Sequence, residues 1–504
     1  MKSCLYRILS LSCVLALFGS NVLAKDYEDY ESSSKYENDY GTDPKYNDYG
    51  GGIDQMGGKQ KDAQEEDYSP FTKSTGRIEE SDVIGIRISG KKLVLFSADK
   101  KYYEEQIQGN IFSEFDFFAK YPRLLSVDLS NMSLNRKVLQ GLRKYLPKTI
   151  KSLIINSCSI ENKDFEELTD IIIEHKQLEF ITVVAPNYAQ AESAKLIAAI
   201  GDLKVVRGLS LTLGKLESGG CDILGEIFAK SKETLTSLNL GFMKVEDNKS
   251  YDALIDSLGQ LKKLTMLEYS VLESTENQVG KFFDSLARLR ALIDLKLCFY
   301  DFKDHEGVEA YRNAENLNEA MKNLTNLESL DISNMDLPES VLQTISRSMG
   351  KLTHLRTLNI SGDPIVVKTA KVLAKSLQKL ENLVTLIANN CEISSETFSA
   401  LCEGFRNSSL KHMYFSGNKI KSSVKSFPVS QMKELVLLDF SHNNINLKDI
   451  VDFMKTIPSE TRLEVVNWKS NDLKGLSEEQ KIRERDELKA WKKIHRISTL
   501  DLGI

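Results

Sequence analysis

The chain has 504 residues, of which 41% are hydrophobic and 27% charged, an ordinary composition for a large globular protein. Nine prolines, seven cysteines and six histidines exclude a collagen-like chain, a disulfide-dense mini-protein and a histidine-rich metal store. The net charge of −6 is unevenly distributed, with +2 in residues 1–24, −9 in residues 25–82 and +1 in the remainder. The near-neutral charge of residues 83–504 argues against a nucleic-acid partner, because proteins that bind nucleic acids usually carry strongly basic domains.

The first 24 residues, MKSCLYRILSLSCVLALFGSNVLA, have the pattern of a secretory signal peptide. Lys2 and Arg7 form a basic start, an apolar stretch follows, and Val22 and Ala24 fit the small-x-small rule for cleavage after Ala24. An uncleaved membrane anchor is the alternative, although the apolar run is shorter than the ~20 residues of a membrane span. We therefore predict a secreted or extracytoplasmic protein with no membrane span after cleavage.

Residues 25–82 are rich in Asp, Glu, Ser, Gly and Tyr and almost lack aliphatic side chains, which predicts a disordered acidic tail. Acidic neighbours suit both tyrosine phosphorylation and tyrosine sulfation. The candidate sites for either modification are Tyr27, Tyr30, Tyr36, Tyr40, Tyr46 and Tyr49. A solvated spacer is the simpler interpretation of this segment, and both interpretations stay open.

From residue 124 onward the chain repeats a unit of about 28 residues. Unit positions 1, 4, 6 and 11 are apolar, and positions 3, 5 and 7 alternate with 4 and 6 along a short strand. Apolar residues at helical spacing follow each strand and predict a helix that packs on it. The thirteen units follow the template L-x-x-L-x-L-x-x-N/C-x-L and begin at Leu124, Ile150, Leu178, Val206, Leu235, Leu264, Leu292, Leu327, Leu355, Leu383, Leu410, Leu435 and Leu463.

These repeats resemble the leucine-rich repeat superfamily, and their length resembles its ribonuclease-inhibitor-like class, over residues 124–475. The resemblance implies an α/β fold: a curved solenoid, or horseshoe, with a parallel β-sheet on the concave side and helices on the convex side. Middle units lack the Asn or Cys of unit position 9 and need another way to pair the backbone of the turn. That position is matched by Cys158, Cys391, Asn418, Asn443 and Asn471.

Both ends of a solenoid need caps, because each end exposes a sheet edge and a core face. We predict an N-terminal cap in residues 83–123 and a C-terminal capping helix in residues 476–504. Neither end shows the clustered cysteines of many secreted members of the superfamily, and the cysteines after the signal peptide are expected to be thiols. This departure favours a bacterial secreted or surface protein, a candidate effector that meets a host or envelope protein.

Candidate partner-binding residues lie on the concave wall of the central units. Exposed aromatic and Arg side chains on a concave surface are typical of interface anchors. The C-terminal units present Ser, Asn and Asp instead, and the insertion at residues 301–317 is a second candidate for shaping a partner site. The candidate residues are Phe180, Arg207, Phe242, Met266, Glu268, Lys296 and Phe299, of which Phe242 and Phe299 stand at unit position 8 and have the core as an alternative location.

No catalytic, metal or cofactor site is predicted, because the histidines lack metal-ligand spacing and no glycine-rich phosphate loop follows a strand. The sequence predicts a monomeric, non-enzymatic protein-interaction module whose partner binds the concave face. Two alternatives remain. One is a regulator of a GTPase through a supplied arginine, such as Arg207 or Arg356. The other is a glycan-binding adhesin that uses the polar C-terminal wall.

Overall fold

A computed structural model describes residues 72–73, 78–89, 92–97, 100–106, 117–184, 190–245, 247–299, 308–406, 408–458, 460–471, 477, 479, 482–483, 486 and 498–501. The predicted signal peptide, the tyrosines proposed for modification, residues 301–307 of the insertion and most of the predicted capping helix lie outside these residues. The domain boundaries drawn from the sequence therefore stay predictions.

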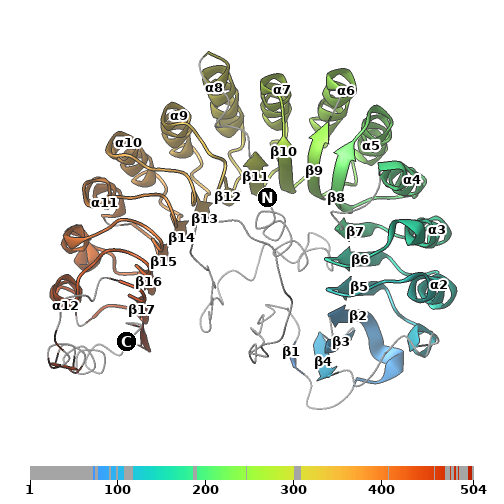
Figure 1. Cartoon of the computed structure of the whole chain (residues 1–504), viewed down its shortest axis with the longest axis horizontal. Helices are drawn as coiled ribbons and strands as arrows, with labels where there is room; N and C mark the ends of the chain where they lie inside the picture. The colour runs from blue at the N-terminus through green and yellow to red at the C-terminus, as the bar shows by residue number, and fades with distance from the viewer. Residues whose placement is uncertain are drawn as a thin grey trace, which may run out of the picture.

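The described residues form an arc with one β-sheet on its inner, concave side and helices on its outer, convex side (Figure 1). This is a leucine-rich repeat solenoid, which confirms the predicted fold class. The strands of the repeats are β5 (Ser126–Ser130), β6 (Ser152–Asn156), β7 (Phe180–Val184), β8 (Gly208–Leu216), β9 (Ser237–Val245), β10 (Met266–Glu273), β11 (Asp294–Phe299), β12 (Ser329–Asp331), β13 (Thr357–Asn359), β14 (Thr385–Ile387), β15 (His412–Tyr414), β16 (Leu437–Asp439) and β17 (Val465–Asn467).

The convex side is built from helices that each follow a strand. They are α2 (Arg136–Tyr145), α3 (Phe165–Glu174), α4 (Gln190–Gly201), α5 (Ser218–Ser231), α6 (Asn248–Leu258), α7 (Glu276–Leu286), α8 (Val308–Asn323), α9 (Glu339–Met349), α10 (Val367–Leu377), α11 (Ser395–Cys402) and α12 (Leu447–Met454). Short 3-10 helices complete the connections at Glu80–Asp82, Phe117–Lys120, Asn162–Asp164, Glu403–Phe405, Ser422–Ser426 and Val429–Gln431. Within the described ranges, no helix is long and apolar enough to cross a membrane.

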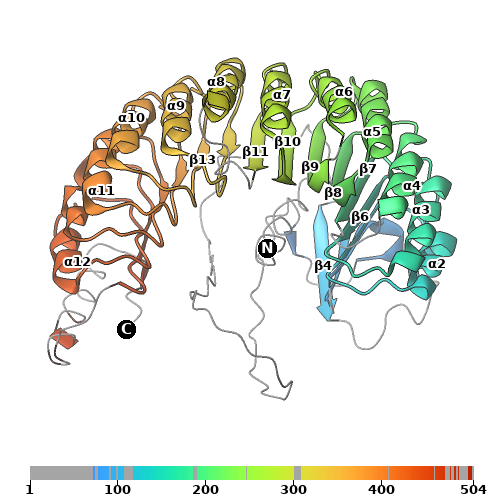
Figure 2. The ribbon, with the colours of Figure 1, turned by 45° about the horizontal axis from the view of Figure 1, so that its top comes forward.

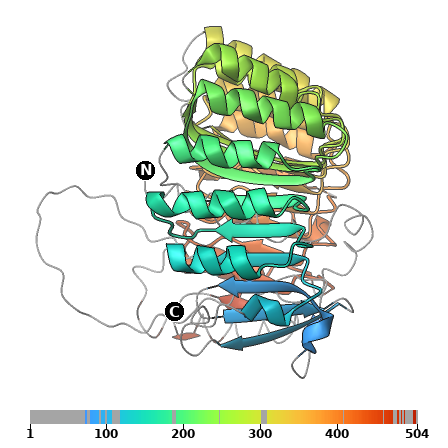
Figure 3. The same ribbon diagram turned by 90° about the vertical axis from the view of Figure 1, so that its right-hand side faces the viewer.

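At the N-terminal end the sheet is extended by strands that are not repeats. Strand β2 (Val83–Ser89) pairs in parallel with β5, and β3 (Lys92–Ser97) and β4 (Lys101–Gln106) follow in antiparallel order. The short β1 (Thr72–Lys73) pairs with β4, and β18 (Thr499–Asp501) pairs with β17 at the other end. The additional N-terminal strands, in blue, lie at one end of the stack of repeats (Figure 3).

One continuous hydrophobic core runs between the sheet and the helices, from Ile78 to Trp468. In the fifth unit, the residues at positions 1, 4, 6 and 11 are all buried, as the template predicts: Leu235, Leu238, Leu240 and Val245. Helix α7 shows how the helices form: Thr275 and Gln278 make a reciprocal capping box at its start, and the apolar residues that follow are buried. Burying each large apolar side chain contributes about 1.5–3 kcal/mol.

In several units, the turn after the strand depends on side-chain hydrogen bonds from unit position 9. Asn418 Oδ1 accepts the N–H groups of Cys391 and Ile393, each at 3.0 Å, and its Nδ2 donates to the carbonyls of Ala388 and Phe415. This confirms the role predicted for the position, since these buried backbone groups would otherwise lack partners. Comparable bonds to backbone groups are made by Asn443, Asn471, Cys158 and Cys391.

In the middle units, which lack Asn or Cys at unit position 9, longer strands pair the backbone groups instead. Strands β8 and β9 have 9 residues each and β10 has 8, whereas β12 to β17 have 3 each. Their pairing continues past unit position 8, to Lys215 opposite Lys244 and Leu216 opposite Val245. Ladder hydrogen bonds between strands therefore replace the Asn and Cys contacts of the other units.

Candidate interaction surface on the concave face

Unit positions 3, 5 and 7 point to the concave side of the sheet, because positions 4 and 6 between them belong to the core. Five of the seven predicted partner-binding residues lie on or beside this surface, in units three to seven. The helices of the described residues lie on the other, convex side of the sheet (Figure 2). The five are Phe180, Arg207, Met266, Glu268 and Lys296.

The structure brings Met266, Glu268 and Lys296 together on β10 and β11. Glu268 and Lys296 stand opposite each other in the register, and Lys296 Nζ lies 2.8 Å from Glu268 Oε1. Asn239 Nδ2 donates to the other carboxylate oxygen of Glu268 at 2.8 Å, and the hydroxyl of Ser237 contacts the sulfur of Met266 at 3.4 Å. The cluster is held by contacts between neighbouring strands and is only partly exposed.

Two further carboxylates, Asp294 and Asp331, complete this cluster and were not singled out from the sequence as partner-binding residues. Asp294 precedes Lys296 at unit position 3, and Asp331 stands opposite Lys296 in the register of β11 and β12. Burial raises the pKa of Asp294 to about 6, and the charges of Glu268 and Asp331 add to the effect. Burial alone would lower the pKa of Lys296, but the charge and hydrogen bond of Glu268 outweigh it and raise that pKa.

These four groups define the acidic cluster: Glu268, Asp294, Lys296 and Asp331. It holds three carboxyl groups around one ammonium group, all partly buried on the concave face. The sequence signal for it was present, because all four stand at unit position 3 or 5, but the grouping depends on strand register, which only the structure gives.

Phe180 and Arg207 lie further along the same face, on β7 and just before β8. The ring of Phe180 lies over Gly208, where a Cβ would come within 2.6 Å of ring carbon Cδ1. Arg207 Nε lies 2.8 Å from Glu179 Oε2, and Lys151 contacts the same carboxylate. Partial burial alone would raise the pKa of Glu179, but hydrogen bonds from Lys151 and Arg207 outweigh it and lower that pKa. The guanidinium of Arg207 is thus already engaged within the protein.

Phe242 and Phe299 are not on the concave surface, so the prediction that they bind a partner is wrong for these two. Both are buried, at 3% and 1% exposure, and pack around Tyr269 in the core with ring centroids 5.5 and 5.7 Å away. The reason is the longer strands of the middle units: because the strand continues through unit position 8, that side chain alternates back into the core with positions 4 and 6. Val271 of β10 is buried at the same position.

The C-terminal concave wall is polar over part of its width, as the sequence indicates. Asn359 donates to Asp331 at 3.1 Å, and Ser361 donates to Asn359 at 2.7 Å. Further along, the hydroxyls of Ser416 and Ser441 are 2.8 Å apart. The same wall also carries apolar and aromatic residues, which the prediction of a polar wall did not include. These partly or fully buried residues are Ile387, Tyr414, Leu437 and Val465.

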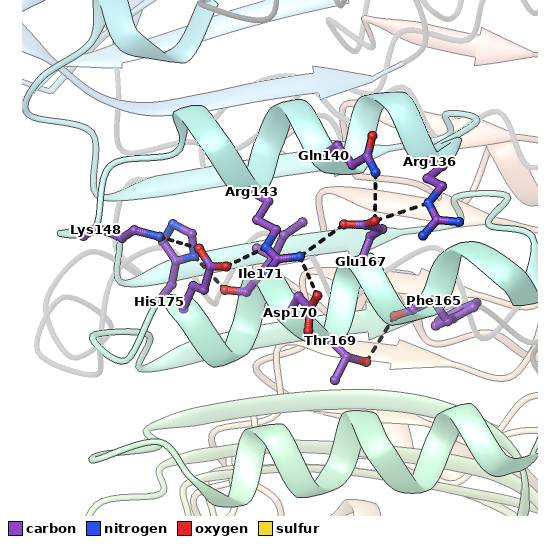
Figure 4. A network of polar contacts seen from close by, with 11 residues as sticks. Arg136, Gln140, Arg143, Lys148, Phe165, Glu167, Thr169, Asp170, Ile171 and His175 are labelled. Carbon is purple, nitrogen blue, oxygen red and sulfur yellow. Dashed lines mark hydrogen bonds and ion pairs between the residues drawn. The ribbon is translucent and has the colours of Figure 1, made fainter.

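On the convex side, a network of charged residues joins helices α2 and α3 (Figure 4). Glu167 accepts from Gln140 at 2.9 Å and lies 3.3 Å from Arg136 Nε, while Arg143 Nε lies 2.5 Å from Glu174. The hydrogen bonds from Gln140, Arg136 and Arg143 lower the pKa of Glu167. These contacts connect adjacent repeats, and they pair the charged groups of the two helices with one another. The network is therefore a structural feature.

Among the described residues, most histidine and cysteine side chains are buried or hydrogen-bonded. His175 is buried, with Nδ1 2.6 Å from the carbonyl of Ile171. Burial raises the pKa of the Cys158 thiol to about 11 and that of the Cys391 thiol to about 12. No group of three or more candidate metal ligands occurs among the residues with described positions.

Comparisons with known proteins add little beyond the fold. No protein-family model matches this chain. Among solved structures, a crystal structure of a TLR13–ssRNA13 complex is similar at 16% sequence identity and a TM-score of 0.35. The similarity covers 70% of this chain and 46% of that chain, so this chain spans about half the length of its neighbour. It concerns only the solenoid fold, which the repeats and the parallel sheet establish independently.

Proposed function

We propose that this protein is a non-enzymatic interaction module that binds a protein partner on its concave face, across β7 to β12. The acidic cluster carries this proposal. Its three carboxyl groups outnumber its single cation, and the burial of Asp294 makes the charged form costly without a further positive partner. A lysine or arginine side chain of a protein partner would supply that charge, while Met266 beside the cluster would contact its apolar stem.

We also propose that the chain is exported after cleavage at Ala24 and meets its partner outside the cytoplasm of a bacterial source. The basic start, apolar stretch and small residues of the first 24 positions support export. Units of about 28 residues, with a helix after most strands, support the ribonuclease-inhibitor-like class of repeat. The modification of the tyrosines between residues 27 and 49 stays a prediction.

The experiment for the acidic cluster is a selection from a random peptide library displayed on phage, with the full chain as bait. We expect the selected peptides to be enriched in Arg and Lys. Their affinity should fall about ten-fold or more in a Glu268→Gln, Asp331→Asn variant, because a buried charge pair loses one partner. The matched control is Glu381→Gln, Glu396→Gln, which removes two exposed carboxylates elsewhere. Peptides that bind all three proteins equally, or a selection without basic enrichment, would refute the proposal.

A further inference from the structure

Helix α10, on the convex side, carries a row of exposed lysines and contains no acidic residue. Lys368, Lys371 and Lys375 lie three and four residues apart, so they share one face of the helix. Lys379, also exposed, continues the row just beyond the end of the helix. The residues on the opposite face of α10 are buried. From Lys368 to Lys375 the row spans about 10 Å at the usual helical rise.

The end of the neighbouring helix α9 adds two more exposed cations, Arg347 and Lys351. Helices α9 and α10 lie next to each other on the outer side of the arc (Figure 1). The stem of Lys379 reaches the end of α9, because a Cβ at Gly350 would lie 3.2 Å from its Cδ. Together these cations form the basic ridge, which consists of Arg347, Lys351, Lys368, Lys371, Lys375 and Lys379.

Nearby acidic residues do not balance the positive charge of the basic ridge. Between residues 337 and 380 the only carboxylates are those of Glu339 and Asp363, and Asp363 is buried. Among the residues that the structure describes, none of the six cations lies within ion-pair distance of a carboxylate. The guanidinium of Arg347 donates instead to the neutral side chain of Gln343 at 3.2 Å.

The stability of the helix itself does not account for this arrangement. A cation is favourable at the C-terminal end of a helix, but Lys368 lies in the first turn of α10, where the helix dipole makes a positive charge unfavourable. Like charges four residues apart, as at Lys371 and Lys375, also destabilise a helix. Elsewhere on the convex side cations pair with carboxylates between helices, as Arg288 does with Asp256 at 2.9 Å. The basic ridge is therefore suited to a negative charge outside the protein.

The composition and shape of the basic ridge favour a membrane surface as the source of that charge. Five of its six cations are lysines, which act as point charges and lack the fixed planar geometry of a guanidinium. No Phe, Tyr or Trp occurs between residues 337 and 397, so this part of the chain offers no such ring for stacking on a base or a sugar. The outer side of a convex arc can touch a flat surface with two neighbouring helices at once (Figure 1).

We propose that the basic ridge binds a lipid bilayer with anionic headgroups, so that α9 and α10 lie against the membrane and the concave face is turned away from it. Clusters of about four to eight Lys or Arg residues on a helix are typical of sites for anionic lipids. Val366, at the start of α10, is 40% exposed and would contact the membrane together with the apolar stems of the lysines. In this orientation the membrane does not compete with the proposed protein partner on the concave face.

Co-sedimentation of the full chain with vesicles tests the proposal. Vesicles of neutral phosphatidylcholine are compared with vesicles in which about 30% of the lipid is anionic phosphatidylglycerol. We expect the affinity for the anionic vesicles to exceed the affinity for the neutral vesicles by about ten-fold or more at low salt, and this difference to disappear at about 0.5 M salt. Apolar residues elsewhere in the chain affect binding to both kinds of vesicle alike, so the difference between the two affinities reports on charge.

Two variants with the same change in net charge assign the difference to the basic ridge. The ridge variant is Lys368→Gln, Lys371→Gln, Lys375→Gln, Lys379→Gln. It should bind the two kinds of vesicle equally, because each lysine near an anionic surface strengthens binding by up to about five-fold. The control, which should keep the preference for anionic vesicles, removes four exposed lysines from the fourth and fifth units: Lys232→Gln, Lys249→Gln, Lys262→Gln, Lys263→Gln.

Equal affinity of the unmodified chain for the two kinds of vesicle would overturn the proposal. A preference for anionic vesicles that the ridge variant keeps, or that the control variant loses to the same extent, would also overturn it. Retention on immobilised heparin without binding to anionic vesicles would overturn it as well, because it would assign the basic ridge to a linear polyanion. None of these results bears on the proposed function, which the selected peptides test separately.

Discussion

Asp363 stands at unit position 9, where the four repeats that follow hold Cys or Asn. Its carboxyl oxygens accept the N–H groups of Leu337 at 2.9 Å and Met335 at 3.3 Å, as an asparagine oxygen would. An asparagine would also donate from its amide nitrogen, as Asn418 does to Ala388. An ionised carboxylate has no such donor, and burial raises the pKa of Asp363 to about 7.

Asp363→Asn should therefore stabilise the protein, and more at high pH than at low pH. Because the pKa of Asp363 is raised in the folded state, its contribution to stability is fully present below about pH 4 and is lost as the pH rises through 7. We expect the melting temperature of the variant to exceed that of the wild type by about 2–4 °C at pH 8, with little difference at pH 4. Differential scanning calorimetry at both pH values measures this. A variant that melts lower than the wild type at pH 8 would show that Asp363 is retained as a charged group.

At the scale of single elements, unit position 8 decides how each strand ends. In the units with short strands it has a positive φ, as at Asn390 (54°) and Gly417 (70°). In the middle units the strand continues and the position holds residues such as Phe242 and Val271. Asn and Gly tolerate the left-handed conformation, whereas β-branched and aromatic residues do not. The residue type at position 8 therefore distinguishes the two kinds of unit in the sequence, and this would have placed Phe242 and Phe299 in the core.

Gly417→Ala tests the turn. A Cβ at Gly417 would clash with Oδ1 of Asn390, and φ is +70°, so the substitution is strained in two ways. We expect a loss of about 1–2 kcal/mol in unfolding free energy, measured by urea titration. Gly219→Ala in helix α5 is the control, because a Cβ there meets nothing within 4 Å. It should be neutral or stabilising by up to ~1 kcal/mol. Equal effects of the two substitutions would contradict this account of the turn.

The charged network between α2 and α3 gives a pH-dependent prediction. The pKa of Glu167 is lowered in the folded state, so its contribution is present above the ordinary pKa of a glutamate and is lost as the pH falls below it. Glu167→Gln should lower the urea midpoint at pH 7 but leave it nearly unchanged at pH 3. The same loss at both pH values would instead assign the effect to packing.

For the molecule as a whole, the sequence predicted the solenoid because thirteen units repeat in register, and stacking repeats is the way such units bury their apolar faces. The binding surface was predicted only in part. Met266, Glu268 and Lys296 were found from unit position alone, whereas the grouping of Asp294 and Asp331 with them depends on strand register.

The central claim is that the concave face from β7 to β12 contacts a protein partner. Quantitative affinity capture from host-cell lysate tests it most directly, with the full chain compared with the variant Phe180→Ala, Met266→Ala, Glu268→Gln. The control is Ile173→Ala, Val366→Ala, Glu396→Gln, which changes two exposed apolar residues and one exposed carboxylate away from this face. We predict that the full chain and the control enrich the same proteins. The enrichment of these proteins by the concave variant should be lower by about ten-fold or more. Equal enrichment by all three proteins, or none by any, would contradict the claim.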